Sequence, residues 1–264
     1  FELQLDGRII DRAVKWDLGV NFSLNRSKVL VLSEDKDIFG GELDNTILKD
    51  QLNLMRVGEP MYVFYGYVED GYDENGHIVY KNMDDDPAIT AADKTIIGDP
   101  NPDFLVNLTT AVSYKGFTLS AFFQSSIGND IYSLSMAAQA YDYGYNGNTL
   151  REVYYNHWTP ENPTAKYPNL DQTSYKMSDR FVYDGSFVRL KNLELAYDVP
   201  CARSKFIKRA RVYVSAQNLF TITSYPFWDP DINANGGGSS MIQGVDSYCY
   251  PSARTYTIGC RLTF

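Results

Sequence analysis

Apolar and polar residues alternate with a period of two along several long segments of the chain. The clearest segment is 16–25, in which polar residues or glycine separate the apolar residues Trp16, Leu18, Val20, Phe22 and Leu24. Successive side chains of a β-strand point to opposite faces, so this pattern predicts a strand with one face in hydrocarbon or core and the other in water. The alternation recurs up to the last residue, which predicts an all-β chain.

Seven such strands are expected, most of about 10 to 13 residues, and a tilted strand needs about 9 to 11 residues to cross a bilayer. The connections between them alternate between short and long: residues 11–14, 28–102, 115–116, 128–185, 200–209 and 223–253. Short turns on one side and long loops on the other are typical of a transmembrane antiparallel β-barrel of the outer membrane. The long loops would then be extracellular. Since a single-chain bacterial barrel normally has an even number of strands, we expect these seven to belong to a larger barrel.

A secreted β-sandwich is the alternative fold, because its strands alternate as well. Sandwich strands average about five or six residues and seldom have such long connections, so the barrel is favoured. Three local features carry further predictions. The apolar phase changes at Asn192, which predicts a β-bulge. Residues 73–76 predict a hairpin turn, and the apolar residues of 130–143 predict a short helix.

Charge and composition exclude several classes of protein. The 264 residues include 24 Lys and Arg against 33 Asp and Glu, a formal charge of −9, whereas a nucleic-acid binder needs clustered cations. No apolar run approaches roughly 18 residues, which excludes helical membrane spans. The 3 cysteines and 2 histidines lack the spacing of a metal site or a catalytic triad. The chain starts at Phe1 inside a strand-like pattern, so we expect a fragment of a longer protein.

The last strand, residues 254–264, ends on an aromatic residue with an apolar residue at every second position before it. This pattern resembles the signal by which the outer-membrane assembly machinery recognises its client proteins. We therefore predict a periplasmic C-terminus and an assembly signal that faces lipid, formed by Tyr256, Ile258, Leu262 and Phe264.

Five motifs, in the same order along the chain, resemble the C-terminal part of SusC/RagA-type TonB-dependent transporters. They are GDPNPDF (98–104), DGSFVRLKN (184–192), AQNLFT (216–221), WDPD (228–231) and YPSARTY (250–256). The resemblance spans nearly the whole chain. It implies that residues 1–264 are the C-terminal part of a 22-stranded barrel whose N-terminal strands, plug and TonB-contacting segment are absent from this sequence.

The resemblance also implies a function without covalent chemistry, so the chain is expected not to be an enzyme. Members of the family import oligosaccharides or peptides across the outer membrane of Bacteroidetes, which are Gram-negative bacteria. A SusD-like lipoprotein covers the extracellular face, and the TonB complex delivers energy through the plug. We favour an oligosaccharide as cargo. The alternatives are a peptide importer of the RagA type, a soluble extracellular carbohydrate-binding domain and a glycoside hydrolase.

The acidic segment 82–93 has the spacing of an EF-hand loop. Its candidate Ca²⁺ ligands are the side chains of Asn82, Asp84, Asp86 and Asp93 and the carbonyl of Ala88. Two features depart from the motif: Pro87 replaces the glycine that permits the sharp turn, and Asp93 is shorter than the usual bidentate glutamate. A solvated acidic loop without metal is the alternative interpretation.

Aromatic rings beside polar side chains in two long loops suggest a binding surface for cargo. Flat rings stack on sugar faces, and carboxylates or amides can hydrogen-bond to hydroxyl groups. The candidate residues are Tyr141, Tyr143, Tyr154, Tyr155, Trp158, Tyr225, Trp228 and Asp229. Rings that pack loops together, or that form the aromatic girdles of a barrel, are the alternative.

Overall fold

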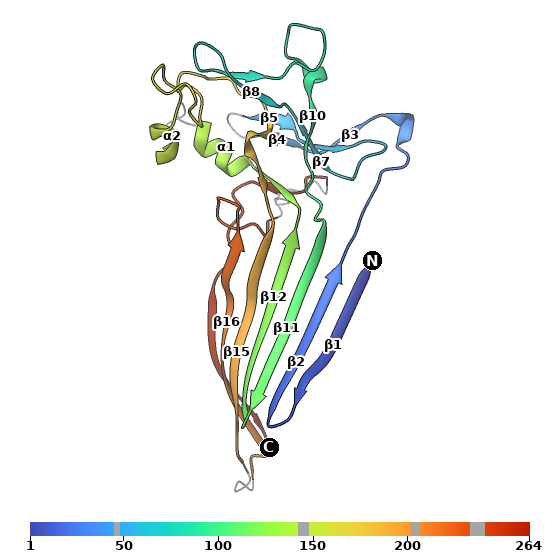
Figure 1. Cartoon of the computed structure of the whole chain (residues 1–264), viewed down its shortest axis with the longest axis vertical. Helices are drawn as coiled ribbons and strands as arrows, with labels where there is room; N and C mark the ends of the chain where they lie inside the picture. The colour runs from blue at the N-terminus through green and yellow to red at the C-terminus, as the bar shows by residue number, and fades with distance from the viewer. Residues whose placement is uncertain (45–47, 142–147, 202–205, 233–240) are drawn as a thin grey trace.

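The computed structural model describes residues 1–44, 48–141, 148–201, 206–232 and 241–264. Its largest sheet is antiparallel and has seven strands that are neighbours in chain order (Figure 1). The strands are β1 (Glu2–Asp11), β2 (Val14–Ser23), β11 (Phe104–Tyr114), β12 (Phe117–Ile127), β15 (Phe187–Val199), β16 (Arg209–Thr223) and β18 (Thr255–Thr263). The seven strands expected from the sequence are confirmed, and their ends lie within a few residues of the expected ones.

The register of this sheet separates an apolar face from a polar face. Directly paired residues of adjacent strands point to the same face, so rows can be followed across the sheet. One row is apolar on all seven strands: Ile10, Trp16, Val112, Leu119, Leu195, Val214 and Ile258. A row on the opposite face is mostly polar: Arg8, Asp17, Ala111, Ser120, Glu194, Ser215 and Thr257. This division is the one expected of a barrel wall between lipid and water.

Aromatic rings lie near both ends of the apolar face. At one end the rings of Phe22 and Phe104 stack with centroids 5.8 Å apart, and at the other end those of Phe117 and Tyr197 are 4.5 Å apart. Phe104 and Tyr114 are the first and last residues of β11 and share this face. Ten residue steps of about 3.3 Å, at a tilt of about 40°, give a height of about 25 Å, which matches the apolar band of outer-membrane barrels.

Two local features of the strands follow from their residues. Lys115 and Gly116 join β11 to β12 with φ angles of 46° and 86°, both positive as a type I′ hairpin turn requires. The register of β15 shifts between Leu190 and Asn192 against both neighbouring strands, which confirms the expected bulge.

The three long connections fold together into a head at one end of the sheet, and the short turns lie at the other end (Figure 1). The first connection contains η1 (Ser33–Asp35), β3 (Ile38–Phe39), β4 (Glu42–Asp44), β5 (Lys49–Gln51), β6 (Asn53–Met55), β7 (Val63–Gly66), β8 (Glu69–Tyr72), β9 (Ile78–Tyr80), η2 (Ala91–Asp93) and β10 (Thr95–Gly98). The second contains β13 (Asp130–Ser133), α1 (Leu134–Tyr141), α2 (Arg151–Tyr155), η4 (Asp179–Phe181) and β14 (Val182–Asp184), and the third contains β17 (Val245–Asp246).

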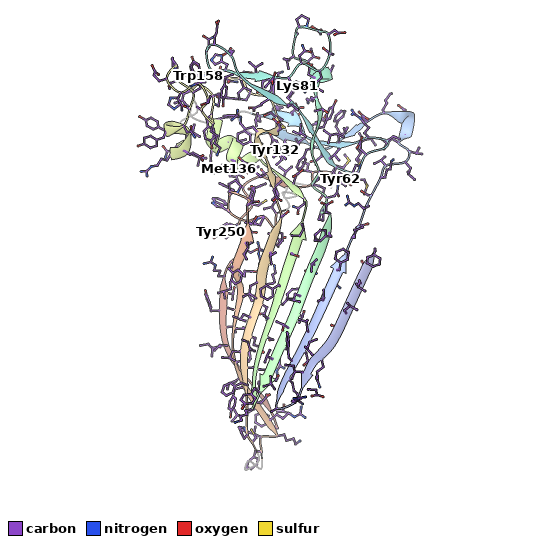
Figure 2. All side chains as sticks on the ribbon, in the orientation of Figure 1. Tyr62, Lys81, Tyr132, Met136, Trp158 and Tyr250 are labelled. Atoms are coloured by element: carbon purple, nitrogen blue, oxygen red, sulfur yellow. The ribbon has the colours of Figure 1, made fainter. Side chains whose placement is uncertain are left out.

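The buried core of the molecule lies in the head. Phe64, Tyr132 and Phe181, from the first two connections, and Val245, from the third, are at most 2% exposed. Figure 2 shows Tyr132 and Met136 inside this region. Within the described residues, every helix is too short or too polar to cross a membrane.

Two smaller expectations for the head can be compared with the structure. The turn at 73–76 closes the β8–β9 hairpin, where Asp73 Oδ1 accepts the backbone N–H of Asn75 at 2.9 Å and of His77 at 2.8 Å. The helix expected over 130–143 is only partly right. Asp130–Ser133 forms β13 because it pairs with both β14 and β17, and α1 begins at Leu134.

A glycine marks the pairing of the last two strands. Gly259 on β18 is paired with Tyr213 on β16. A Cβ atom at Gly259 would overlap the Tyr213 ring, so the ring lies directly over the glycine backbone.

Candidate functional site

A cleft opens where the polar face of the sheet meets the head. It consists of two cavities of about 430 and 260 Å³ that are lined in common by Pro100, Pro102, Asn129, Pro230 and Ile232. Uncharged polar side chains complete much of its lining: Asn101, Asn107, Gln124 and Gln243. The cleft therefore combines apolar ring surfaces with groups that both donate and accept hydrogen bonds, as small-ligand sites commonly do.

A buried arginine fastens one wall of this cleft to the sheet. Arg189, on the polar face of β15, is 1% exposed and forms ion pairs with Asp229 and, at 3.2 Å, with Asp231. Its Nε atom donates to Thr221 Oγ1 at 2.9 Å, and its Nη1 atom donates to Ser252 Oγ at 3.2 Å. We call these contacts the Arg189 clasp. They hold the segment after β16 against the sheet.

Asp229 is bound by the protein itself. Its carboxylate accepts the backbone N–H groups of Asp231 and Ser252, both at 2.9 Å, in addition to the Arg189 guanidinium. Burial opposes ionisation, but these hydrogen bonds and the arginine hold the pKa of Asp229 below its ordinary value. In this arrangement the carboxylate fixes the loop, and its predicted contact with cargo stays a prediction.

Three of the rings expected to contact cargo are open to solvent. Tyr154, Tyr155 and Trp228 are 61%, 74% and 56% exposed. The rings of Tyr154 and Tyr155 lie edge to face, with centroids 5.1 Å apart, and Trp228 stacks on Phe227 at 4.7 Å. Each of these rings therefore keeps part of its surface open to solvent, and in Trp228 one face is covered by Phe227.

The other rings of this set pack within the head or lie outside the described residues. Tyr141 and Tyr225 are each 4% exposed, and the Tyr225 hydroxyl donates to Asp246 Oδ2 at 2.6 Å. Trp158 lies in the head (Figure 2). It packs against Gly76, where a Cβ atom would overlap its ring. Tyr143 falls in the part of the chain that the structure does not describe. Tyr141 and Tyr225 therefore stabilise the loops in this conformation.

The first part of the acidic loop is organised by side chains that accept backbone N–H groups two residues ahead. Asn82 Oδ1 accepts from Asp84 at 3.1 Å, Asp84 Oδ1 from Asp86 at 2.8 Å, and Asp86 Oδ1 from Ala88 at 3.0 Å. These are successive Asx turns. These hydrogen bonds shape the first half of the loop.

Asp93, the candidate ligand at the end of the acidic loop, already has partners. Its Oδ1 accepts the N–H of Met83 and its Oδ2 that of Thr90, both at 2.7 Å, and these hydrogen bonds lower the pKa of Asp93. Among the described residues, no three His, Cys, Asp or Glu side chains form a group that could hold a metal ion. Ca²⁺ binding at this loop would therefore require Asp93 to give up its hydrogen bonds to Met83 and Thr90, and the calcium site stays a prediction.

The predicted assembly signal lies on β18 and at the residue after it. Tyr256, Ile258, Leu262 and Phe264 are 69%, 87%, 45% and 70% exposed. Ile258 belongs to the apolar row described above, so its outward position agrees with contact with lipid. Recognition by the assembly machinery stays a prediction.

The sequence analysis did not single out Arg189 or the amides of the cleft. A signal was present for the arginine, since Arg189 lies in the motif 184–192 and Asp229 and Asp231 lie in the motif 228–231. A buried arginine needs carboxylate partners. Asn107 and Gln124 stand at polar positions of alternating strands, and only the register shows that they are neighbours.

The chain is similar to known proteins both in sequence and in structure. No family model matches the chain. The TonB-dependent receptor P3 of Formosa agariphila is 31% identical over 286 residues, which cover 100% of this chain and 28% of P3. The TonB-dependent receptor SusC of Bacteroides thetaiotaomicron is 28% identical over 266 residues, which cover 97% of this chain and 25% of SusC.

Solved structures give the same result. The structure of the RagAB peptide transporter matches with a TM-score of 0.80 and 26% identity, over 100% of this chain and 28% of that chain. The chain thus spans 28% of the length of P3 and of the RagAB chain. These relatives are receptors and transporters, not enzymes, as the sequence analysis expected. The two-faced sheet, the motifs and these matches together fit a C-terminal fragment of a SusC/RagA-type TonB-dependent transporter, in the part that forms its β-barrel.

Proposed function

We propose that this chain supplies wall and extracellular loops to a TonB-dependent transporter in the outer membrane of a Gram-negative bacterium. The apolar face of the sheet suits lipid, and the polar face suits the barrel interior. The head faces the outside, and the C-terminus lies in the periplasm. The rest of the protein supplies the remaining strands, the plug and the contact with TonB, and a SusD-like lipoprotein covers the head.

The cargo that this surface suits best is a neutral oligosaccharide. The observation that carries this proposal is the presence of exposed rings on the head, at Tyr154, Tyr155 and Trp228, together with a cleft lined largely by uncharged groups. Rings stack on the faces of sugars, and amide groups donate to and accept from their hydroxyl groups.

Peptide import is the second candidate. It is supported by the match to the RagAB peptide transporter, whose sequence is 26% identical to this chain. The proline rings of the cleft would also suit a peptide. A soluble carbohydrate-binding domain and a glycoside hydrolase have less support, because the relatives that match the whole chain are receptors and transporters.

Uptake by the full-length transporter with its lipoprotein tests the proposal. Labelled neutral hexasaccharides and labelled neutral hexapeptides are offered to cells with and without TonB. We expect uptake of a glycan that requires TonB and that falls when Tyr154 and Tyr155 are both replaced by Ala. Tyr250→Ala, at another exposed ring (90%), is the matched control and should leave uptake unchanged. Uptake of peptides but not of glycans would show that the cargo is a peptide. Uptake that does not require TonB would contradict the proposal of a TonB-dependent transporter.

A further inference from the structure

The short turns at the end of the sheet opposite the head carry exposed cations. They are Arg12 between β1 and β2, Lys115 between β11 and β12, and Lys208 just before β16, and we call them the turn cations. The β1–β2 and β11–β12 turns lie together at the lower end of the sheet (Figure 1). None of the turn cations forms an ion pair with a carboxylate of the described residues. They stand out in a chain whose formal charge is −9.

The carboxylates near these turns are paired with arginines of the polar face. Arg8 pairs with Asp17 at 2.8 Å and with Asp11 at 3.6 Å. Arg211 pairs with Asp198 at 3.3 Å. The turn cations are therefore left without a counter-ion in the described part of the chain, and they suit an anion that the chain itself does not supply.

Lys115 stands on the side of the sheet that the apolar face covers. Its ammonium group lies 5.2 Å from the centre of the Tyr114 ring, and Tyr114 belongs to the apolar face. The rings of Phe117 and Tyr197, whose centroids are 4.5 Å apart, lie on the same face at the same hairpin. The Tyr114 hydroxyl forms no hydrogen bond within the described residues. Two donors on neighbouring residues, an ammonium and a phenol, are thus free at the edge of the apolar face.

The position of Lys115 along the strand is the level of lipid headgroups. Tyrosines of a barrel's aromatic girdle lie at the boundary between hydrocarbon and headgroups. The headgroup layer on each side of the hydrocarbon is about 5 to 7 Å thick. Lys115 follows Tyr114, the last residue of β11, by a single step of about 3.3 Å. The Lys115 ammonium therefore falls in the layer that contains the lipid phosphates.

Arg12 is close enough to Lys115 to share a ligand. The register pairs Tyr114 with Val14, two residues after Arg12, so the β1–β2 and β11–β12 turns are adjacent. Their centres are two strand spacings apart, about 10 Å, which two long side chains can bridge. Lys208 belongs to a more distant turn. We infer that the two adjacent turns bind the phosphate of an anionic glycerophospholipid of the periplasmic leaflet, with Lys115 and the Tyr114 hydroxyl as donors and Arg12 as the second cation.

This inference rests on the proposed function, because it takes the sheet as a barrel wall with its short turns in the periplasm. The test uses the full-length transporter in phosphatidylcholine vesicles, with Leu119→Trp as a reporter on the apolar face of the same hairpin. Quenching of this tryptophan by brominated phosphatidylglycerol is compared with quenching by brominated phosphatidylcholine, after subtraction of the signal of the parent protein. We expect a preference for phosphatidylglycerol that high salt removes, since salt screens the charges.

Removal of the hairpin cation should lower this preference. Lys115→Asn, made in the reporter protein, should lower it about fivefold, the contribution of one cation near an anionic membrane surface, and Arg12→Gln should lower it further. Asparagine suits the φ angle of 46° at position 115, so the turn is kept. Lys115→Arg retains the cation and should retain the preference. Leu195→Trp, next to Leu119 in the same apolar row, replaces the reporter if Leu119→Trp assembles poorly.

Lys15→Gln is the matched control. Lys15 pairs with Ser113, so it stands at nearly the same height as Lys115 but on the polar face, and its loss changes the net charge equally. We expect the lipid preference of Lys15→Gln to equal that of the wild type. Equal losses in Lys15→Gln and Lys115→Asn would assign the effect to the net charge of the protein and overturn the site. An unchanged preference in Lys115→Asn would overturn it as well.

Failure of this inference is distinguishable from failure of the proposed function. If the two brominated lipids quench the reporter equally in the wild type, the apolar face contacts lipid and only the headgroup site is overturned. If neither lipid quenches the reporter, the apolar face does not contact lipid. In that case the barrel wall of the proposed function is overturned together with the headgroup site.

Discussion

The guanidinium of Arg189 donates to the carboxylate of Asp229, and both side chains are buried, at 1% and 8% exposure. Arg189 belongs to the wall and Asp229 to the loop between β16 and β18. Replacing one partner of a buried ion pair leaves the other charge unpaired and costs about 3 to 5 kcal/mol. We expect Arg189→Met to lower the free energy of unfolding of the full-length transporter by about this amount. Denaturant titration measures it, and proteolysis of residues 224–254 reports the released loop.

Arg26→Met is the control for this experiment. Arg26 pairs with Asp103 at 2.8 Å, but both side chains are mostly exposed, so its loss should change stability by less than about 1 kcal/mol. The double variant Arg189→Met/Asp229→Leu should recover part of the stability. Equal effects of Arg26→Met and Arg189→Met would show that the clasp adds nothing.

Low pH should weaken the attachment of the loop between β16 and β18 to the sheet. The pKa of Asp229 is lower in the folded protein than its ordinary value, so its stabilising effect is complete above about pH 4 and is lost as the pH falls through the lowered pKa. We expect the thermal midpoint of the wild type to fall more steeply below pH 4 than that of Asp229→Asn. Parallel curves from pH 7 to pH 3 would be inconsistent with this role for the carboxylate.

Calcium binding to the loop 82–93 is expected to be weak. A Ca²⁺ ion held by Asp84, Asp86 and Asp93 must displace the backbone N–H groups that Asp93 now accepts. We expect a dissociation constant of about 10⁻⁴ to 10⁻³ M in calorimetric titration of the chelator-treated transporter. Asp84→Asn/Asp86→Asn should abolish the heat of binding, with Mg²⁺ as the control ion. Identical titrations of the variant and the wild type would show that this loop does not bind Ca²⁺.

Position on the last strand should decide how a charge affects assembly. Ile258 lies on the apolar face and is 87% exposed, so Ile258→Arg would place a cation in lipid at a cost of roughly 2 to 4 kcal/mol near the midplane. We expect less folded transporter in the outer membrane, measured by the heat-dependent shift of the barrel on electrophoresis. Arg261→Ala, on the opposite face of β18, should assemble normally. Normal assembly of Ile258→Arg would place this residue away from lipid.

The two tryptophans expected to contact cargo should behave differently. Trp228 is exposed, and its replacement by Ala should weaken glycan binding about tenfold, which is about 1.4 kcal/mol, without loosening the head. Trp158 packs against Gly76, so Trp158→Ala should increase proteolysis of the β8–β9 hairpin. Glycan affinity that is unchanged in Trp228→Ala would assign its ring to packing against Phe227.

The strands of the barrel wall could be predicted from the sequence because each carries its own period-two pattern. The bulge near Asn192 was visible for the same reason, as a change of phase inside one strand. The head gave no such signal, since its short strands are set by partners far along the chain. The N–H of Tyr67, for example, donates to the carbonyl of Met177 at 2.9 Å. Residues 130–133 of the expected helix form β13 for the same reason, because they pair with β14 and β17, which lie far along the chain.

The residues of the candidate site also depend on contacts that the sequence does not reveal. Exposed and buried tyrosines look alike in sequence, and only the packing of the head separates Tyr154 from Tyr141. Asp229 has the chemistry of a sugar ligand, but Arg189 occupies it across 40 residues of chain. Asn107 and Gln124 of the cleft are neighbours only through the pairing of β11 with β12, so no single segment reveals them.

Gly259, which lies beneath the Tyr213 ring, fixes the alignment of β18 with β16. If β18 slid along β16 by one residue, Ile258 and its apolar neighbours would turn toward the barrel interior. A slide by two residues would keep the faces but bring Thr257 or Arg261 under the Tyr213 ring, where the Cβ atom has no room. Gly259 thereby excludes both two-residue slides, which the hydrophobic pattern alone would tolerate, and leaves β18 its present alignment with β16.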